Sequence, residues 1–458
     1  MLKRWNAKCG YEEALKIGMP LVISMASHTI MLFTDRVFLG RYDLDTLAAA
    51  FPASMTNFLF FSFFMGTLEY VGVFVAQYTG AVRHERVGAA IWQGVYFCLP
   101  AAAIMAFLGL NAHTLFDLVG HDPAIRQLEV DYFSIVSLGS FFPLVAVAFS
   151  SFYSGRGITK PVMFVNMLAA MVNIPLDYMM INGIGPFPEL GIKGAALATV
   201  TAGCFNSLLL GKLVFTSRHN AKYGVLSNWR FELNLFKRFL KYGLPGGTQF
   251  FLDMFAISFF GFMVGQFTKA ELAATNIAIS IDTLAFLPAV GMSIAASIMV
   301  GQAMGRGDQK LARYATNTVL HLVMLYMGCM AIIFIFTPEP LLRLFKTTGM
   351  SEAEFAPIIG MGIVFLRYVA AFTLMDALLN AYMGGLKGAG DTRFIMYVMG
   401  TLSISVMVVP MMLIYKFTDL GIHGPWVCLL AYVCILAVIF RWRFGGTSWL
   451  KHRVIEGT

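Results

Sequence analysis

The sequence predicts an all-α integral membrane protein, and three observations carry that prediction. Of the 458 residues, 58% are hydrophobic and only 13% are charged, whereas a soluble domain carries about 25% charged residues. Apolar runs of roughly twenty residues, the length a helix needs to cross a bilayer, recur along the chain. The runs are continuous rather than alternating, which excludes a transmembrane barrel. This composition also excludes a disordered chain and argues against the soluble multidomain enzyme that length alone would suggest.

Charged residues, glycines and prolines divide the apolar runs into twelve predicted transmembrane helices. They span residues 14–39, 51–77, 88–110, 130–153, 161–183, 191–214, 239–265, 273–302, 313–336, 357–384, 394–415 and 422–441.

The distribution of basic residues predicts how these helices are oriented. Loops on one side of the membrane, together with both termini, hold 23 of the 33 Lys and Arg residues. Because basic loops stay on the cytoplasmic side, we expect both termini to be cytoplasmic. The N-terminal stretch lacks a small-residue cleavage site, so it is not expected to be a signal peptide. We therefore expect a multi-pass protein of the cytoplasmic (inner) membrane.

The chain also contains an internal duplication. Each copy holds six helices, an even number, so both copies enter the membrane in the same sense and their pseudo-two-fold axis should run along the membrane normal. We predict an N-lobe over residues 1–215, a basic cytoplasmic linker over 216–238 and a C-lobe over 239–458. A shift of 225 residues, without a gap, matches Gly18, Pro20, Gln77 and Gly80 with Gly243, Pro245, Gln302 and Gly305.

Several function classes lack their characteristic motifs. The six cysteines do not have the spacing of a zinc site. No phosphate-binding GxxxxGK[ST] loop is present, nor are the HExxH and GxSxG signatures of hydrolases. The net charge of +8 is explained by the cytoplasmic loops, so it does not call for a nucleic-acid partner. We expect neither an enzyme nor a cofactor.

Ionisable residues at membrane depth are the most informative part of the sequence. Burying a charged side chain near the centre of a membrane helix costs about 2.5–3.5 kcal/mol, so such residues usually have a function. Seven residues fall in this class: Asp35, Glu69, Asp177, Asp253, Asp282, Arg367 and Asp376.

The strongest constellation is Asn173-x-x-x-Asp177 in the fifth predicted helix. A spacing of four places both side chains on one helix face. With Asp35 and Thr199 they could supply the oxygen ligands of a small cation such as Na⁺. Alternatively Asp35 and Asp177 share a proton, or the polar side chains only hold neighbouring helices together.

A second acidic pair is predicted in the C-lobe. Asp253 and Asp376 could face a cavity and attract a cationic ligand or exchange protons. Arg367 lies nine residues from Asp376, on the opposite helix face, so it needs a partner on another helix. Asp282 and Glu69 are the candidates for a structural ion pair with it.

Two prolines sit at matched places in the first and seventh helices. Pro20 and Pro245 each remove a backbone hydrogen bond and permit a kink. Such kinks act either as hinges or as tolerated bends, and their symmetry favours hinges.

These residues resemble the multidrug and toxic compound extrusion (MATE) family over nearly the whole chain. The resemblance implies twelve helices in two lobes and cation-coupled export. It also implies that Asp35, Asn173, Asp177 and Thr199 form an N-lobe cation site and that Asp253 and Asp376 form a C-lobe acidic site. Two departures are Ser27-His28, where the family commonly has a glutamine, and Asp253, where many members have Glu.

The sequence therefore predicts a secondary active exporter that uses a Na⁺ or H⁺ gradient to expel bulky, mostly cationic amphiphilic drugs by alternating access. We expect it to act as a monomer in the lipid bilayer, without a nucleic-acid partner. The alternative is a flippase for lipid-linked sugar precursors, although such a substrate would require more basic residues inside the cavity. A non-transporting structural protein would have no reason to keep so many intramembrane carboxylates.

Overall fold

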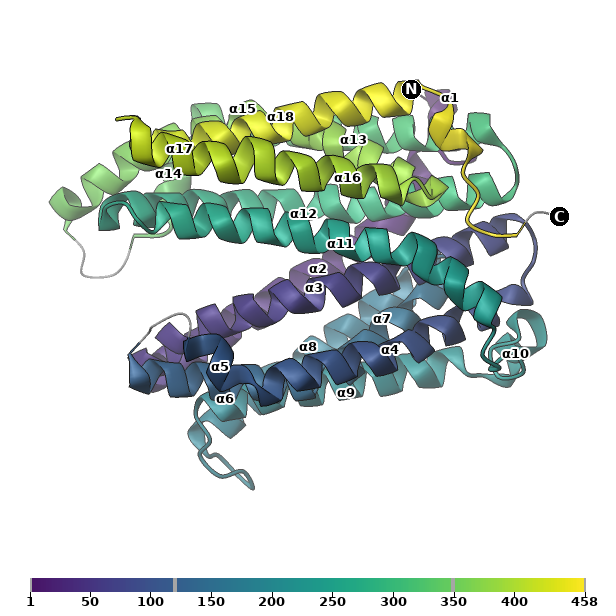
Figure 1. The fold of residues 1–458 in the computed structure, drawn as a ribbon, viewed down its shortest axis with the longest axis horizontal. Helices are drawn as coiled ribbons and strands as arrows, with labels where there is room; N and C mark the ends of the chain where they lie inside the picture. Colours follow the sequence, from purple (N-terminus) through teal and green to yellow (C-terminus); the bar gives the residue numbers. More distant parts are fainter. Residues whose placement is uncertain (1, 118–121, 347–350, 457–458) are drawn as a thin grey trace. The chain divides into compact units, whose positions relative to one another are not determined.

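The computed structural model describes residues 2–117, 122–346 and 351–456, and it contains helices but no strands within these ranges (Figure 1). Among the residues that the structure describes, eleven helices are long and apolar enough to cross a membrane, and a bent helix pair makes the twelfth crossing. The predicted all-α membrane architecture of twelve helices is thus confirmed.

The crossings follow the predicted ranges closely, and most extend beyond them at one or both ends. Shorter helices lie between the crossings and at the ends: α1 (Leu2–Trp5), α5 (Ala112–Asp117), α10 (Ser217–Tyr223), α14 (Pro338–Arg343) and η2 (Ser448–Lys451). The crossings are α2 (Tyr11–Tyr42), α3 (Leu44–Gly80), α4 (Arg86–Leu110), α6 (Pro123–Leu138) with α7 (Phe141–Ser154), α8 (Lys160–Asn182), α9 (Ile192–Val214), α11 (Leu233–Val264), α12 (Lys269–Gly305), α13 (Gln309–Phe336), α15 (Glu352–Ala389), the run α16 (Thr392–Leu402), η1 (Ser403–Val408) and α17 (Val409–Phe417), and α18 (His423–Gly445).

The fourth crossing is broken rather than continuous. Helices α6 and α7 meet at an angle of 43°. Pro143 lacks the N–H group that would bond the carbonyl of Gly139, one helical turn earlier. That carbonyl accepts a bond from the Phe142 N–H at 3.3 Å instead. The bend therefore has a local cause that the sequence contains.

The chain forms two compact units. The first unit comprises residues 1–19, 252–300 and 308–453, and the second comprises residues 20–251, 301–307 and 454–458. The first part of α2 thus belongs to the unit formed mainly by the second repeat. The first part of α11 belongs to the unit formed mainly by the first repeat. The lobe boundaries at residues 215 and 239 stay predictions, because they describe the repeats in the sequence rather than these units.

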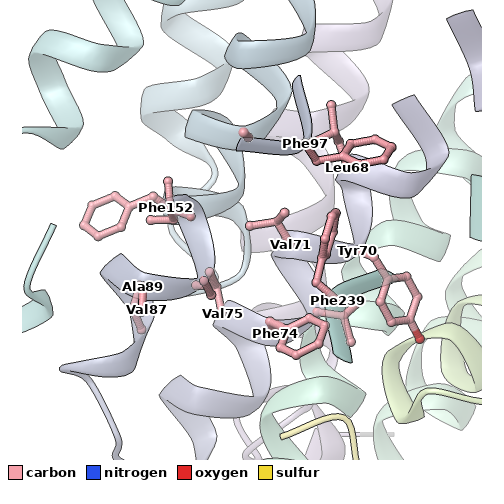
Figure 2. Close-up of a cluster of buried hydrophobic side chains, with 14 of the residues drawn as sticks. Leu68, Tyr70, Val71, Phe74, Val75, Val87, Ala89, Phe97, Phe152 and Phe239 are labelled. Atoms are coloured by element: carbon pink, nitrogen blue, oxygen red, sulfur yellow. The ribbon is translucent and has the colours of Figure 1, made fainter. Parts of the chain in front are cut away.

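The core of the second unit is built from α3, α4, α7 and the first part of α11 (Figure 2). Leu68, Val71 and Phe74 are buried along α3, and Phe239 of α11 packs edge-on against the Phe74 ring. Val454 and Ile455, close to the end of the chain, belong to the same cluster. These two late residues are therefore part of the core of the second unit.

Close helix crossings recur at positions related by the duplication. In the first unit, a Cβ atom on Gly18 would lie 2.4 Å from the Met292 sulfur, so α2 approaches α12 closely there. In the second unit, a Cβ atom on Gly243 would lie 3.0 Å from the Thr67 carbonyl oxygen. Thr67 and Met292 are themselves 225 residues apart, so the same packing occurs twice.

A buried ion pair anchors the end of α18 in the first unit. Arg443 donates to both carboxylate oxygens of Asp391, at 2.7 and 3.2 Å, and His452 lies 3.3 Å from the same group. Burial alone would raise the pKa of Asp391, but the bonds from His452 and Arg443 outweigh it and hold that pKa below its usual value. Asp391 therefore stays charged and keeps the pair intact at neutral pH.

Candidate ion and substrate sites

Asp35 and Asp177 come together in the second unit. Asp35 lies on α2 and Asp177 on α8, and their carboxyl groups lie close enough to interact electrostatically. Asn173 lies one turn before Asp177 on α8, as the spacing of four predicts. We call Asp35, Asn173, Asp177 and Thr199 the carboxyl site.

The carboxyl site is buried and short of hydrogen-bond donors. Asp35 is 7% exposed, Asn173 1% and Asp177 0%. Within the described residues, one Asp35 oxygen, both Asp177 oxygens and both polar atoms of the Asn173 amide are buried without a hydrogen-bond partner. Because buried polar groups are normally satisfied, this concentration of unsatisfied atoms indicates a site that takes a ligand.

A tyrosine that the sequence reasoning missed completes the site. Tyr132 on α6 is 4% exposed, lies near Thr199 of α9, and interacts electrostatically with both carboxyl groups. Its position in an apolar run gave no sign of this role, because a tyrosine there is also an ordinary core residue. Thr199 thus joins the site through Tyr132.

Pro175 lies between the two functional residues of α8. As a proline inside a helix, it leaves the carbonyl of Met171 without its usual N–H donor. The helix can therefore deviate locally where Asn173 and Asp177 project.

The arrangement limits the chemistry of the carboxyl site. Two ionised carboxylates so close together in a buried place repel each other, so the pair is stabilised when one of them is protonated. A small cation between them would satisfy the same charges, because carboxylate, amide and hydroxyl oxygens are hard ligands. The residues present therefore fit either a proton or Na⁺, the two ions that the sequence left open.

The first unit contains an acidic cluster of three residues rather than the predicted two. Asp376 of α15 lies close enough to Asp253 of α11 and Asp282 of α12 to interact electrostatically with both. Asn380, one turn further along α15, donates to a carboxylate oxygen of Asp376 at 3.3 Å. All three aspartates are partly buried.

Polar groups from two further helices lie near this cluster. Tyr432 of α18, 4% exposed, interacts with Asp253 and forms a 3.1 Å hydrogen bond with Ser403. Ser403 begins η1, a π-helical segment within the eleventh crossing, and such segments occur frequently at functional sites. Asp253 also interacts electrostatically with Lys387.

The remaining candidate residues are distributed along the helices. Arg367 is exposed on α15 and forms no ion pair with Asp282 in the described part of the first unit. The expected pair with Glu69 stays a prediction. The acidic cluster instead brings Asp282 to Asp376, while Glu69 is exposed on α3. Pro20 and Pro245 lie inside α2 and α11. The boundary between the two units crosses α2 at Pro20.

Known proteins resemble this chain over almost its full length. The MatE family matches residues 20–179 and 247–413. The chain is 27% identical over 434 residues to a probable multidrug resistance protein NorM of Rhodopseudomonas palustris, which covers 94% of this chain and 91% of that protein. It is 23% identical to a probable NorM of Thermotoga maritima, with 97% and 94% covered.

Solved structures show the same fold. A MOP superfamily transporter from Pyrococcus furiosus matches with a TM-score of 0.85 and 20% identity, covering 99% of both chains. A multidrug resistance MATE family transporter in an outward-facing conformation matches with a TM-score of 0.85 and 19% identity, covering 97% of both chains.

The twelve crossings and these matches define a multi-pass membrane transporter of small molecules rather than an enzyme. The chain belongs to the MatE family of multidrug efflux transporters.

Proposed function

We propose that the protein is a secondary active exporter that uses an inward Na⁺ or H⁺ gradient to expel bulky, mostly cationic amphiphilic compounds. The observation that carries this proposal is the buried pair of Asp35 and Asp177, three of whose four carboxyl oxygens lack hydrogen-bond partners among the described residues. A pair that is stabilised by one proton or one cation can serve as the coupling site.

Coupling requires only that the ion and the drug favour different states of the protein. Ion binding at Asp35 would change the charge that α2 holds inside the unit. Pro20, fifteen residues earlier in the same helix, gives α2 a place to bend. Pro245 occupies the corresponding place in α11, which supports a matched hinge in the second repeat.

The acidic cluster supports the choice of cationic substrates. Asp253, Asp282 and Asp376 place three carboxyl groups near one another inside membrane-spanning helices, where a cationic ligand would offset their charge. The relatives named as multidrug resistance proteins support drugs as the class of substrate. We further propose a monomer in the cytoplasmic membrane with both termini inside the cell.

A flippase for lipid-linked sugar precursors fits these sites less well. Binding a pyrophosphate would favour basic groups, whereas the ionisable groups of both sites are mainly carboxyl groups. Resistance of an expressing cell to ethidium would support export over lipid flipping.

The deciding experiment measures ethidium transport by the purified protein in lipid vesicles, with a Na⁺ and an H⁺ gradient imposed separately. We expect Asp35→Asn to reduce gradient-driven transport at least about tenfold, because it removes one charge of the coupling pair. Asp45→Asn is the matched control, since Asp45 is exposed at the start of α3. Undiminished transport by Asp35→Asn would remove Asp35 from the mechanism, and absence of gradient-driven transport in the wild type would reject the proposed function.

A further inference from the structure

Three polar side chains form a hydrogen-bonded chain across α2, α8 and α9 in the second unit. Asn206 donates from its amide to the Asn166 oxygen at 2.9 Å, and Asn166 donates to the Ser24 hydroxyl at 2.5 Å. Ser24 is 7% exposed, and the other two are partly buried. We call Ser24, Asn166 and Asn206 the polar triad.

The polar triad lies on the same three helices as the carboxyl site and on the same helix faces. On α2 the serine lies eleven residues before Asp35, on α8 the asparagine lies seven before Asn173, and on α9 the asparagine lies seven after Thr199. Steps of seven and eleven residues return to within about 20° of the same face of a helix. At 1.5 Å per residue, the triad therefore forms a second polar layer about 10–16 Å from the carboxyl site.

The direction of this displacement is the same in all three helices. It runs toward the start of α2 and α8 and toward the end of α9. Those ends carry Lys16, Lys160 and Lys212, and the sequence places them on or nearest the cytoplasmic side. The polar triad thus lies between the carboxyl site and the side to which an inward ion gradient delivers its ion.

One acceptor of the polar triad remains open. The side-chain oxygen of Asn206 is buried and has no hydrogen-bond partner among the described residues. Side chains that served only to hold helices together would be expected to satisfy each other. An unsatisfied amide oxygen inside a membrane helix bundle is instead suited to a water molecule or a partly hydrated cation.

We propose that Ser24, Asn166 and Asn206 form a second, neutral binding site on the path of the coupling ion. This site receives the cation that leaves the carboxyl site or, if the coupling ion is H⁺, the water that carries the proton. Neutral oxygens bind such an ion more weakly than two carboxyl groups do, so this second site releases the ion rather than retaining it. This inference rests on the proposed function and adds the route by which the ion is released.

The test separates the passage of the ion from its binding. Variants Asn166→Leu and Asn206→Leu are reconstituted in phosphatidylethanolamine and phosphatidylglycerol vesicles, and ethidium transport is driven by a Na⁺ or an H⁺ gradient. The ion concentration that releases bound ethidium is measured separately on the protein in detergent. We expect transport to fall about tenfold while this releasing concentration stays within about twofold, because the carboxyl site is unchanged.

A matched control accounts for the loss of a buried hydrogen bond between helices. Asn57 of α3 donates to Ser137 of α6 at 2.8 Å in the same unit, on two helices that carry no residue of the polar triad. We expect Asn57→Leu to lower the thermal midpoint as the triad variants do, yet to transport ethidium normally per folded molecule. Asn166→Ser, which keeps a small polar group, should recover most of the transport lost in Asn166→Leu.

Two outcomes overturn the inference while leaving the proposed function intact. One is transport by both leucine variants equal to that of Asn57→Leu. The other is a shift of the releasing ion concentration as large as that of Asp35→Asn, which would place the triad in the carboxyl site itself. If Asn166→Leu does not fold, the two single variants Asn206→Leu and Ser24→Ala are compared with Asn57→Leu by the same criteria. A wild type without gradient-driven transport would instead reject the proposed function.

Discussion

At the scale of single residues, Tyr132 shows how a tertiary contact assigns a role that the sequence does not display. Its phenol is buried and lies near Thr199 and both carboxyl groups of the site. A tyrosine hydroxyl can hold Thr199 in place and can also offer its oxygen to a cation. Asp35, Asn173 and Asp177, by contrast, were recognisable because carboxyl and amide groups are rare inside membrane helices.

Replacing this tyrosine tests its contribution to ion binding. We expect Tyr132→Phe to weaken ion binding about five- to tenfold, the effect of losing one hydrogen bond worth about 1–1.5 kcal/mol. The measurement is the ion concentration that releases bound ethidium from the purified protein. Tyr153→Phe is the control, because Tyr153 donates to the Leu213 carbonyl elsewhere in the same unit. Equal ion affinities of the two variants would show that Tyr132 has no part in the site.

At the scale of elements, the ends of α3 and α12 cross in a reciprocal way. A Cβ atom on Gly80 would lie 2.0 Å from the Gln302 carbonyl oxygen, and one on Gly305 would lie 2.1 Å from the Gln77 carbonyl oxygen. These four residues are the pairs that the 225-residue shift matches. The duplication therefore produces a local two-fold contact in which each glycine meets the backbone beside its counterpart.

Because backbone atoms cannot move aside as a flexible side chain can, these glycines tolerate no larger residue. We expect Gly80→Ala and Gly305→Ala each to destabilise the protein by about 2 kcal/mol or more, measured as a lower thermal midpoint in detergent. Gly261→Ala is the control, since a Cβ atom on Gly261 in α11 would meet nothing within 4 Å. A thermal midpoint of Gly80→Ala equal to that of Gly261→Ala would contradict the close crossing.

At the scale of the whole molecule, the C-terminal segment belongs to both compact units in turn. Residues up to 453 lie in the first unit, and residues from 454 onward lie in the second. There Val454 and Ile455 are 0% and 2% exposed, and the side-chain oxygen of Gln77 accepts bonds from their backbone N–H groups at 3.0 and 3.4 Å. The segment is thus part of the core and not a free tail.

Removing this segment should therefore destabilise the whole protein. We expect deletion of residues 454–458 to cost about 3–5 kcal/mol, from two lost apolar side chains and the loss of the two backbone N–H groups that donate to the Gln77 oxygen. The thermal midpoint in detergent measures this loss, and deletion of residues 457–458 alone is the control. If both deletions give the same midpoint, the packing of Val454 and Ile455 contributes nothing to stability.

The docked segment should also keep its stability across the physiological pH range. Burial would raise the pKa of Glu456, but a backbone hydrogen bond, the Tyr78 hydroxyl and the charge of Arg86 together lower it. A lowered pKa means that the carboxylate stabilises the fold above its ordinary value, near 4.3, and that this contribution is lost as the pH falls through the lowered pKa. The loss of thermal stability caused by deleting residues 454–458 should thus be nearly constant between about pH 5 and pH 8.

The sequence by itself determined the number of helices, the duplication and most of the acidic residues, because hydropathy, spacing and charge are read locally along the chain. It also contained Pro143, the cause of the bend between α6 and α7. Only the tertiary structure decided that Asp35 meets Asp177, that Tyr132 joins them and that Asp282 lies with Asp376 instead of Arg367. These contacts depend on which faces of distant helices pack together, and that is set by the fit of whole surfaces such as the crossing at Gly80 and Gly305.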